Sequence, residues 1–281
     1  MERQKKRAIL CPNCKSLISR DESRCPYCGI PRPGSWWKNN FLTQGFRDTD
    51  QILMAIIYAN IGFYVLSLLL NIRGTNFSPN PFALLSPDMR SLLVLGATGT
   101  IPINKFHAWW SLLSANYLHG GILHILFNML ALKQLGPLVI EEYGTYRMFI
   151  IYTLGGIFGF LVSYLVGIPL TIGASAAITS LIGAVLYFGK SRGGAYGQIL
   201  FRQIGGWALG IFLFGFLVPG INNWGHGGGM LAGAVLGFLL GYQERRRENL
   251  FFKLLAALCM IVTVIVLVWA VAFGVYLSIV G

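Results

Sequence analysis

Acidic residues are scarce in this chain of 281 residues: Asp and Glu together number 10, against 22 Lys and Arg, so the formal net charge is +12. Charged residues of both signs make up only 11% of the sequence, whereas soluble domains contain about 25%. Hydrophobic residues make up 55% of the chain, and the mean hydropathy is +0.62. A soluble fold of this size cannot bury so much apolar surface, and a disordered chain would be far more polar.

Long polar stretches are missing after the first 50 residues, where apolar runs of about 20 residues recur instead. The 35 glycines follow no three-residue period, which excludes a collagen-like chain, and the runs are too long for soluble strands. A helix of about 20 residues crosses the ~30 Å apolar core of a bilayer. The sequence therefore predicts an all-α polytopic membrane protein. Its seven predicted spans are residues 52–70, 117–136, 147–168, 172–189, 203–219, 224–242 and 250–279.

No cleavable signal peptide is predicted, because the polar segment Met1–Asp50 carries ten basic residues and the first apolar run begins only at Ile52. The connection at 71–116 is too long for a tight turn, so we expect a partly structured loop in the membrane interface. The predicted divisions are a small domain at 1–34, a linker at 35–51 and a membrane domain at 52–281, with its core at 52–242 and an extra helix at 250–279.

Basic residues predict the orientation of the spans. If the connections are assigned alternately to two sides, 19 of the 22 Lys and Arg fall on the side of the N-terminus. Membrane proteins concentrate Lys and Arg in their cytoplasmic loops, so we expect a cytoplasmic N-terminus and an external C-terminus. We accordingly expect a multi-pass protein of a prokaryotic cytoplasmic membrane. The lipid bilayer then accounts for the excess of positive charge, and no nucleic-acid partner is needed.

Two Cys-x-x-Cys pairs predict a metal site in the small domain. Cys11 and Cys14 form the first pair, and Cys25 and Cys28 form the second, ten residues further on. Each pair presents two thiolates from a tight turn, and four thiolates complete the tetrahedral site that Zn²⁺ prefers. Two disulfides or a redox pair are the alternatives, but the cytoplasm keeps thiols reduced. We expect a closed, structural zinc ribbon, and we expect the fifth cysteine, Cys259, to serve packing alone.

Carboxylates are missing from the middle of the membrane domain: no Asp or Glu occurs between Tyr143 and Gln243. An aspartyl protease needs two carboxylates, so an intramembrane enzyme of that class is excluded. The motif His-Glu-x-x-His is also absent, which excludes a membrane metalloprotease of that type. Polar residues within apolar spans mark functional sites by default. Those that remain here are Ser, His and Asn.

Five polar residues are predicted to lie at the external end of the spans. These are His119, His124 and Asn128 near the start of the second span, Ser175 at the start of the fourth and His226 at the start of the sixth. His119 and His124 should point about 140° apart around their helix, whereas His124 and Asn128 share a face. A lone serine or histidine in a span usually serves packing or a structural hydrogen bond, and for His119 we favour that role.

Small residues predict that the fourth and sixth spans pack closely. Ser175, Thr179 and Gly183 are four residues apart, and in the sixth span the same spacing is shown by Gly225, Gly229, Gly233, Gly237 and Gly241. Such stripes let two helices approach closely, which would bring Ser175 and His226 within hydrogen-bond reach. A serine beside a histidine is the nucleophile–base arrangement of a serine hydrolase. His124 and Asn128 would donate hydrogen bonds to an oxyanion.

At these positions the sequence resembles the rhomboid family of intramembrane serine proteases. His119, His124 and Asn128 resemble the family's His-x4-His-x3-Asn helix, and Gly173 and Ser175 resemble its Gly-x-Ser motif. Further similar positions are Leu135, Gly136, Glu141, Tyr143, Gly144, Arg147, Leu181, Gly183, Ala184 and, around His226, Gly228, Gly229 and Gly233. The resemblance covers residues 52–242 and implies a six-helix rhomboid core, to which the seventh span adds the six-plus-one form of the family.

The resemblance implies a dyad without a carboxylate, in which Ser175 is the nucleophile and His226 the general base. His124, Asn128 and the backbone N–H of Ser175 would form the oxyanion hole. The substrate would be a transmembrane protein, cut near its external membrane boundary after a small residue, and catalysis would need no cofactor. The zinc ribbon lies outside the protease fold, where it would recruit a substrate, a cytoplasmic partner or nucleic acid. Asp88 is the one carboxylate expected on the external side.

Three positions depart from the family's pattern. Ala176 follows the serine where the family usually has glycine, and its methyl group would crowd the oxyanion hole. Thr179 replaces a tyrosine that stacks on the histidine, so it leaves the orientation of His226 less well fixed. Ser111 follows Trp110 where the family has arginine. These changes bear on the rate more than on the chemistry.

Two functions of other classes are the alternatives. A non-catalytic rhomboid-like protein, which binds membrane proteins for quality control, usually lacks the serine or the histidine, and this sequence has both. A transporter or channel would need an ionisable relay or inverted repeats, and the sequence shows neither.

Overall fold

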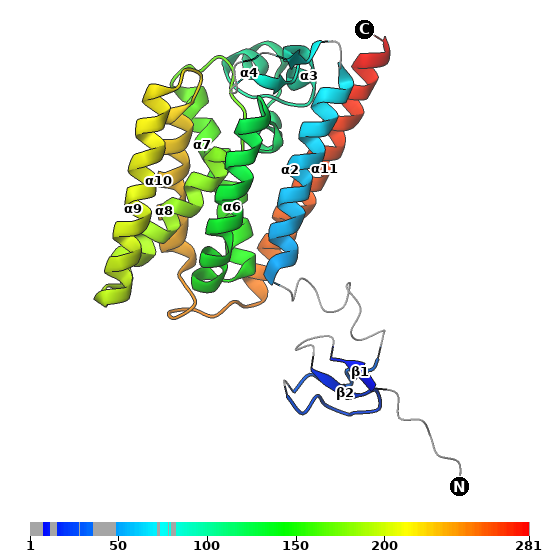
Figure 1. Cartoon of the computed structure of the whole chain (residues 1–281), viewed down its shortest axis with the longest axis vertical. Helices are drawn as coiled ribbons and strands as arrows, with labels where there is room; N and C mark the ends of the chain where they lie inside the picture. Colours follow the sequence, from blue (N-terminus) through cyan, green and yellow to red (C-terminus); the bar gives the residue numbers. More distant parts are fainter. Residues whose placement is uncertain are drawn as a thin grey trace. The chain divides into compact units, whose positions relative to one another are not determined.

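The computed structural model describes residues 8–11, 16–27, 29–35, 49–71, 74–77, 79 and 83–280. The chain divides into two compact units, Met1–Ile52 and Leu53–Gly281. The first unit contains short strands, and the second contains the long helices (Figure 1).

The small unit is built from tight turns. Its two strands, β1 (Ala8–Leu10) and β2 (Leu17–Ser19), pair antiparallel. The N–H of Cys11 donates to the carbonyl oxygen of Ser16 at 2.8 Å, and the N–H of Cys25 donates to that of Ile30 at 2.9 Å. Both cysteines are buried in one cluster with Ile18 and Ile30. Each predicted Cys-x-x-Cys pair therefore begins with a buried cysteine at a turn.

Within the described residues, seven helices of 18 residues or more build the large unit (Figure 1). They are α2 (Thr49–Leu70), α6 (Ile122–Tyr143), α7 (Thr145–Leu165), α8 (Ser175–Arg192), α9 (Gly194–Leu217), α10 (Asn223–Leu240) and α11 (Leu250–Val280). Five of them, α2, α6, α7, α9 and α11, are long and apolar enough to cross a membrane by length and composition. The chain is thus an integral, multi-pass membrane protein. Helices α8 and α10 fall short of that composition because small and polar residues dilute their apolar ones.

The observed helix bounds differ most from the predicted spans in α6 and α9. Helix α6 begins at Ile122 rather than at residue 117, because Gly121 is its N-cap, and it continues past the predicted end at 136 to Tyr143. Helix α9 begins at Gly194 rather than at 203. An apolar run marks only the part of a helix inside the hydrocarbon layer. Backbone hydrogen bonds carry α6 on to its C-cap at Gly144 and α9 back to its N-cap at Gly193.

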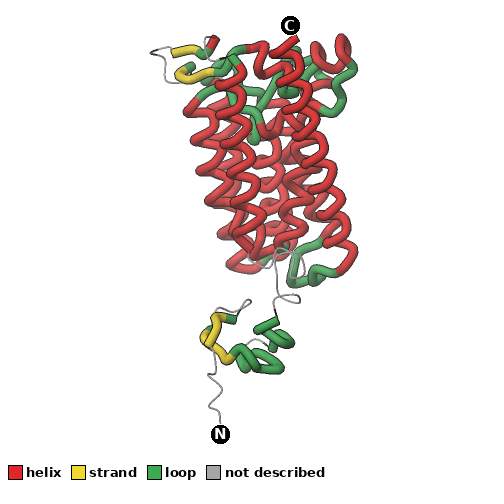
Figure 2. The backbone as a smooth tube through the Cα atoms, turned by 90° about the vertical axis from the view of Figure 1, so that its right-hand side faces the viewer, coloured by secondary structure: helices red, strands yellow, loops and turns green. Residues whose placement is uncertain are grey.

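The loop at 71–116 is partly structured, as predicted. Its elements are β3 (Asn76–Phe77), β4 (Leu84–Ser86), α3 (Met89–Val94), α4 (Thr100–Phe106), α5 (Ser111–Ser114) and the 3₁₀ turn η2 (Ala115–Tyr117). Figure 2 shows these short elements gathered at one end of the helix bundle. Asp88 caps α3, since its carboxylate accepts from the N–H of Arg90 at 3.0 Å. The carboxylate that we expected on the external side therefore serves this helix.

Helices α8 and α10 touch through their backbones. A Cβ added at Gly183 would lie 1.9 Å from the carbonyl oxygen of Met230, and one added at Gly233 would lie 1.7 Å from that of Ser180. Neither helix could approach so closely if these residues carried side chains. The predicted close contact between the two stripes of small residues is thus confirmed.

Arg147 binds the C-terminal end of α10. This buried guanidinium donates from Nη1 to the carbonyl oxygen of Gly241 at 2.6 Å and lies 4.8 Å from the ring centre of Phe252. Glu248 in turn accepts from the backbone N–H groups of Tyr146 and Arg147. The turn between α10 and α11 is therefore fastened to the start of α7.

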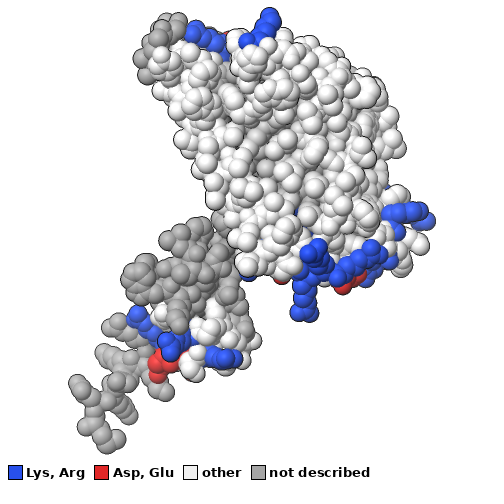
Figure 3. Space-filling model, turned by 180° about the vertical axis from the view of Figure 1, so that it is seen from behind, with Lys and Arg blue, Asp and Glu red and all other residues white. Residues whose placement is uncertain are grey.

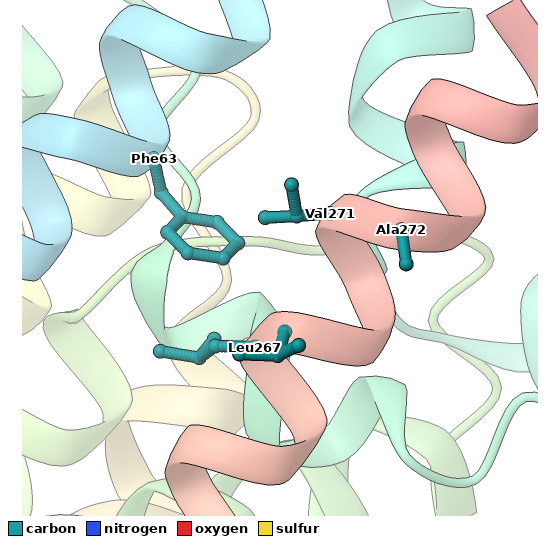
Figure 4. A pocket seen from close by; sticks show the side chains of 5 residues that line it. Phe63, Leu267, Val271 and Ala272 are labelled. Carbon is teal, nitrogen blue, oxygen red and sulfur yellow. The ribbon is translucent and has the colours of Figure 1, made fainter.

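Charged side chains gather at the ends of the helix bundle. On the face shown in Figure 3 a wide band without Lys, Arg, Asp or Glu separates them. Large apolar side chains are exposed along the flanks, among them Leu209, Leu213, Phe216, Leu258, Ile261 and Ile265. Such a band suits contact with lipid chains. A shallow groove beside α11 is lined by the apolar residues Phe63, Leu267, Val268, Val271 and Ala272, and it offers no group for chemistry (Figure 4).

Candidate active site

Ser175 and His226 lie in contact at one end of the bundle. Ser175 is the first residue of α8, and His226 lies in the first turn of α10. The Oγ atom of Ser175 lies 2.9 Å from the Nε2 atom of His226, a hydrogen-bond distance. The backbone contact between the two helices sets this separation. The structure therefore brings together the two residues that the sequence predicts to be nucleophile and base.

The loop before α8 turns sharply to present Ser175. Gly173 has a φ of +126°, a conformation that residues with side chains rarely adopt. Its N–H donates to the carbonyl oxygen of Ala115 at 2.9 Å, which ties the loop to η2. A Cβ at Gly173 would lie 2.7 Å from the Nε2 atom of His124 and 3.6 Å from the Oγ atom of Ser175. The space between the serine hydroxyl and His124 is open only because residue 173 is glycine.

His124 and Asn128 are held within the start of α6. The Nδ1 atom of His124 accepts from the N–H of Gly120 at 3.2 Å, so the neutral ring carries its proton on Nε2, the atom beside residue 173. The Nδ2 atom of Asn128 donates to the carbonyl oxygen of His124 at 2.8 Å, which leaves a second amide proton. As the first residue of α8, Ser175 has a backbone N–H that its own helix cannot satisfy. These groups are suitable donors to an oxyanion.

His119 differs from the sequence prediction in two ways. It lies before the start of α6, and Gly120 and Gly121 turn the chain, so its ring meets that of His124 edge to face with 5.1 Å between ring centres. The expected divergence of about 140° is therefore wrong, because it assumed one continuous helix. His119 is also fully buried, and neither ring nitrogen has a hydrogen-bond partner among the described residues. The structural hydrogen bond that we favoured for it is not found there.

The three residues that depart from the rhomboid pattern each have partners within the bundle, by packing or by hydrogen bonds. Ala176 is buried in an apolar cluster with Ile103, Leu112, Ala115 and Phe160, so its methyl group points into the core. The hydroxyl of Thr179 donates to the carbonyl oxygen of Ala176 at 3.0 Å and does not engage His226. That of Ser111 donates to the hydroxyl of Thr98 at 2.9 Å. The methyl group of Ala176 therefore has apolar packing partners, and its effect on the oxyanion hole stays a prediction.

The Nδ1 atom of His226 is buried, and the described part of the chain supplies it with no hydrogen-bond partner. The carboxylates of Glu142 and Glu248 bind groups other than His226. Glu142 accepts a hydrogen bond from Tyr196, and Glu248 accepts from the start of α7, both at the end of the bundle away from Ser175. Among the described residues, no carboxylate orients the histidine.

The four predicted zinc ligands are only half described. Cys11 and Cys25 are buried in the small unit, whereas Cys14 and Cys28 lie outside the described residues. Within the described ranges, no three His, Cys, Asp or Glu side chains are grouped to hold a metal ion. Zinc binding therefore stays a prediction. Cys259 is buried in α11, where its carbonyl oxygen accepts from the hydroxyl of Thr263 at 2.7 Å.

Asn222 is not among the predicted site residues, yet it contacts three segments around the site. It is the N-cap of α10, and its amide also reaches Ser163 and Thr171. The signal was present in the sequence, because asparagine is a preferred N-cap residue and stands just before the glycine-rich helix. The contacts with Ser163 and Thr171 join distant segments, and no local pattern predicts them.

A family model described as the Rhomboid domain matches residues 107–243 of the chain. "Rhomboid protease GluP" of Bacillus subtilis (strain 168) is 36% identical over 160 residues, which cover 56% of this chain and 31% of that protein. "RHOMBOID-like protein 4" of Arabidopsis thaliana is 32% identical over 167 residues, or 59% of this chain and 42% of that protein. "RHOMBOID-like protein 2" of the same plant is 30% identical over 220 residues, which cover 68% of this chain and 67% of that protein. The chain thus spans less than half the length of the first two relatives.

Proposed function

Because the chain belongs to the rhomboid family, we propose that it is an intramembrane serine endopeptidase that acts through a Ser175–His226 dyad. The observation that carries the proposal is the 2.9 Å separation between the serine Oγ and the histidine Nε2. Those two atoms are carried by the first turns of two helices that pack closely. A non-catalytic relative would have no need of this pair, so the contact favours the protease over the quality-control alternative.

In the proposed mechanism, Nε2 of His226 accepts the proton of Ser175 as its Oγ attacks the scissile carbonyl carbon. The carbonyl oxygen becomes an oxyanion, which accepts hydrogen bonds from Nε2 of His124, the amide of Asn128 and the backbone N–H of Ser175. The protonated His226 then passes its proton to the leaving amine. A water molecule, activated by the same histidine, hydrolyses the acyl-enzyme and restores Ser175. No metal or organic cofactor enters these steps.

We propose that the substrates are transmembrane proteins cut near the external membrane boundary. The first turns of α6, α8 and α10 carry His124, Ser175 and His226, so the reacting atoms lie near one end of the helices. The basic residues are concentrated in the other connections, which favours an external position for this end. The proposed topology has seven spans in a prokaryotic cytoplasmic membrane, a cytoplasmic N-terminus and an external C-terminus.

We further propose that the small unit binds one structural Zn²⁺ through Cys11, Cys14, Cys25 and Cys28. The two described cysteines fit such a site, because both are buried at tight turns of the kind that present thiolates. The ion would supply folding free energy to a unit with a very small apolar core. The role that we propose for this ribbon is the recruitment of a substrate or of a cytoplasmic partner.

Labelling of Ser175 by a fluorophosphonate tests the proposed function. The purified protein in detergent should react covalently with the probe, since the probe needs only an activated serine. The Ser175→Ala variant should not react. A wild-type protein that neither labels nor cleaves transmembrane substrates, while folded by thermal melt, would contradict the protease and favour the non-catalytic alternative.

A further inference from the structure

The ring of His226 has few restraints of its own. Ser175 is its one hydrogen-bond partner within the described residues, because the other ring nitrogen has none there. The hydroxyl of Thr179 donates to its own helix, and in the described part of the chain no carboxylate bonds to the imidazole. The placement of the ring must therefore come from the backbone that carries it, which is the first turn of α10.

Asn222 fixes that first turn. As the N-cap of α10, its Oδ1 atom accepts from the N–H of Gly225 at 3.0 Å. Its backbone carbonyl oxygen accepts from the N–H of His226 at 3.2 Å. An N-cap of this kind satisfies donors that have no partner within the helix. Asn222 therefore sets the conformation of the residues that present the imidazole.

The same side chain also reaches outside its helix. Its Nδ2 atom donates to the Oγ atom of Ser163 at 2.7 Å and to the Oγ1 atom of Thr171 at 3.0 Å. Ser163 is fully buried near the end of α7, and Thr171 lies in the loop at 166–174 that leads to Ser175. One amide group thus joins the helix of the histidine to the loop of the serine.

The surroundings of Asn222 leave little room for another arrangement. A Cβ at Gly225 would lie 3.0 Å from the Nδ2 atom of Asn222 and 3.1 Å from the Oγ atom of Ser163. Thr171 also exchanges two backbone hydrogen bonds with Thr98, at 2.7 and 3.1 Å. The acceptors of the Asn222 amide are therefore themselves held in place, so they can orient it.

We propose that Asn222 is a positioning residue for the Ser175–His226 pair, which acts by linking the start of α10 to Ser163 and Thr171. The inference rests on the proposed serine-protease function. Asn222 acts through His226 and touches no substrate. Its loss would let the first turn of α10 shift relative to the start of α8. A misplacement of about 1 Å in reacting groups costs about 10²-fold in rate.

Three substitutions of Asn222 separate its N-cap hydrogen bond from its hydrogen bonds to Ser163 and Thr171. Asn222→Ser keeps an oxygen for the N–H of Gly225 but is too short to reach Ser163 and Thr171. Asn222→Ala loses both functions. Asn222→Asp keeps the cap and offers an acceptor to the two hydroxyls, which can rotate to donate. Asn223→Ala is the matched control, because the neighbouring amide donates to Phe212 of α9 instead.

Kinetics supply the first readout. Asn222→Ser and Asn222→Ala should lower kcat by about 10–100-fold with KM unchanged, since the lost contact affects the reacting groups rather than substrate binding. The fluorophosphonate labelling rate should fall in parallel. Asn222→Asp should recover most of the loss, and Asn223→Ala should label at the wild-type rate. Thermal melts of each variant establish that it is folded.

Nitrogen NMR of histidine-labelled protein supplies a readout that needs no turnover. The Nε2 signal of His226, assigned with His226→Ala, should shift in Asn222→Ser as it does in Ser175→Ala, because both lose the hydrogen bond to the serine. Wild-type signal, kcat and labelling in folded Asn222→Ser would refute the positioning role. If the wild-type protein neither labels nor cleaves, the proposed protease function fails, and the NMR comparison still decides whether Asn222 places the ring.

Discussion

The imidazole of His124 occupies the space that a side chain at residue 173 would need: a Cβ there would lie 2.7 Å from its Nε2 atom. Gly173 also has a φ of +126°, so both its conformation and its surroundings require glycine. The loop that presents Ser175 and the helix that supplies the proposed oxyanion donors are fitted to each other at this point. The Gly-x-Ser motif thus has a steric cause in this chain.

Gly173→Ala should abolish cleavage, because the methyl group would displace His124 and strain the loop before Ser175. The comparison is Gly167→Ala, which lies in the same loop with a φ of +87° but would meet no atom within 4 Å. That control carries the backbone strain without the clash, so it should melt at a lower temperature yet still cleave. Equal activity of the two variants in a detergent cleavage assay would contradict this account of residue 173.

Ser175→Ala and His226→Ala should each be inactive on a model transmembrane substrate. A serine hydroxyl is a weak nucleophile without a base, so removal of either partner removes the proposed chemistry. Ser175→Ala deletes one hydroxyl from a helix face of small residues, so its melting temperature should stay near that of the wild type. Wild-type turnover by either variant would show that the nucleophile or the base lies elsewhere.

Asn128→Ala should keep measurable activity. The loss of one oxyanion donor typically lowers kcat by about 10²–10³-fold, and His124 and a backbone N–H would remain. The assay is single-turnover cleavage with enough sensitivity to detect a rate a thousandth of the wild type. If a folded Asn128→Ala protein were as inactive as Ser175→Ala, the division of roles between base and oxyanion donors would need revision.

Gly233→Ala should destabilise the membrane domain, because its Cβ would lie 1.7 Å from the carbonyl oxygen of Ser180, a backbone atom that cannot move aside. Overpacking of this kind typically costs about 1–3 kcal/mol or more. Gly227→Ala lies on the same helix and would meet only the ring of Phe212, at 3.5 Å, so it should melt like the wild type. Thermal melts in one detergent compare the pair directly. Equal melting temperatures would mean that α8 and α10 can separate at no cost.

Cys11→Ser combined with Cys14→Ser should remove about one zinc ion per chain, as measured by metal analysis of the purified protein. The dyad chemistry involves no metal, so the doubly substituted protein should still cleave a short model substrate in detergent. Selection of native substrates or partners in cells is the property expected to change. Loss of cleavage in a protein whose membrane domain still melts normally would show that the small unit takes part in catalysis.

Much of the architecture follows from the sequence, because its signals are local and repeated. Apolar runs mark the helices, and glycines every fourth residue mark the α8–α10 contact, which fixes the approach of Ser175 to His226. Helix ends are predicted less well, since α6 continues to Tyr143 and α9 begins already at Gly194. The orientation of His119 is predicted wrongly because Gly120 and Gly121 separate it from the start of α6. The hydrogen bonds of Asn222 join residues 51 and 59 positions apart, and no periodicity carries such information.

The shortness of α8 and α10 has a consequence for the supply of water. At 1.5 Å per residue, an 18-residue helix is about 27 Å long, slightly less than the ~30 Å hydrocarbon layer. A bilayer meets a short helix that faces lipid by thinning around it, and α10 faces outward with exposed apolar side chains such as Leu231 and Phe238. Hydrolysis of the proposed acyl-enzyme consumes one water molecule per turnover at the first turns of these helices. Thinning beside α10 would shorten the path of that water, so we expect the turnover rate to rise in bilayers of shorter acyl chains.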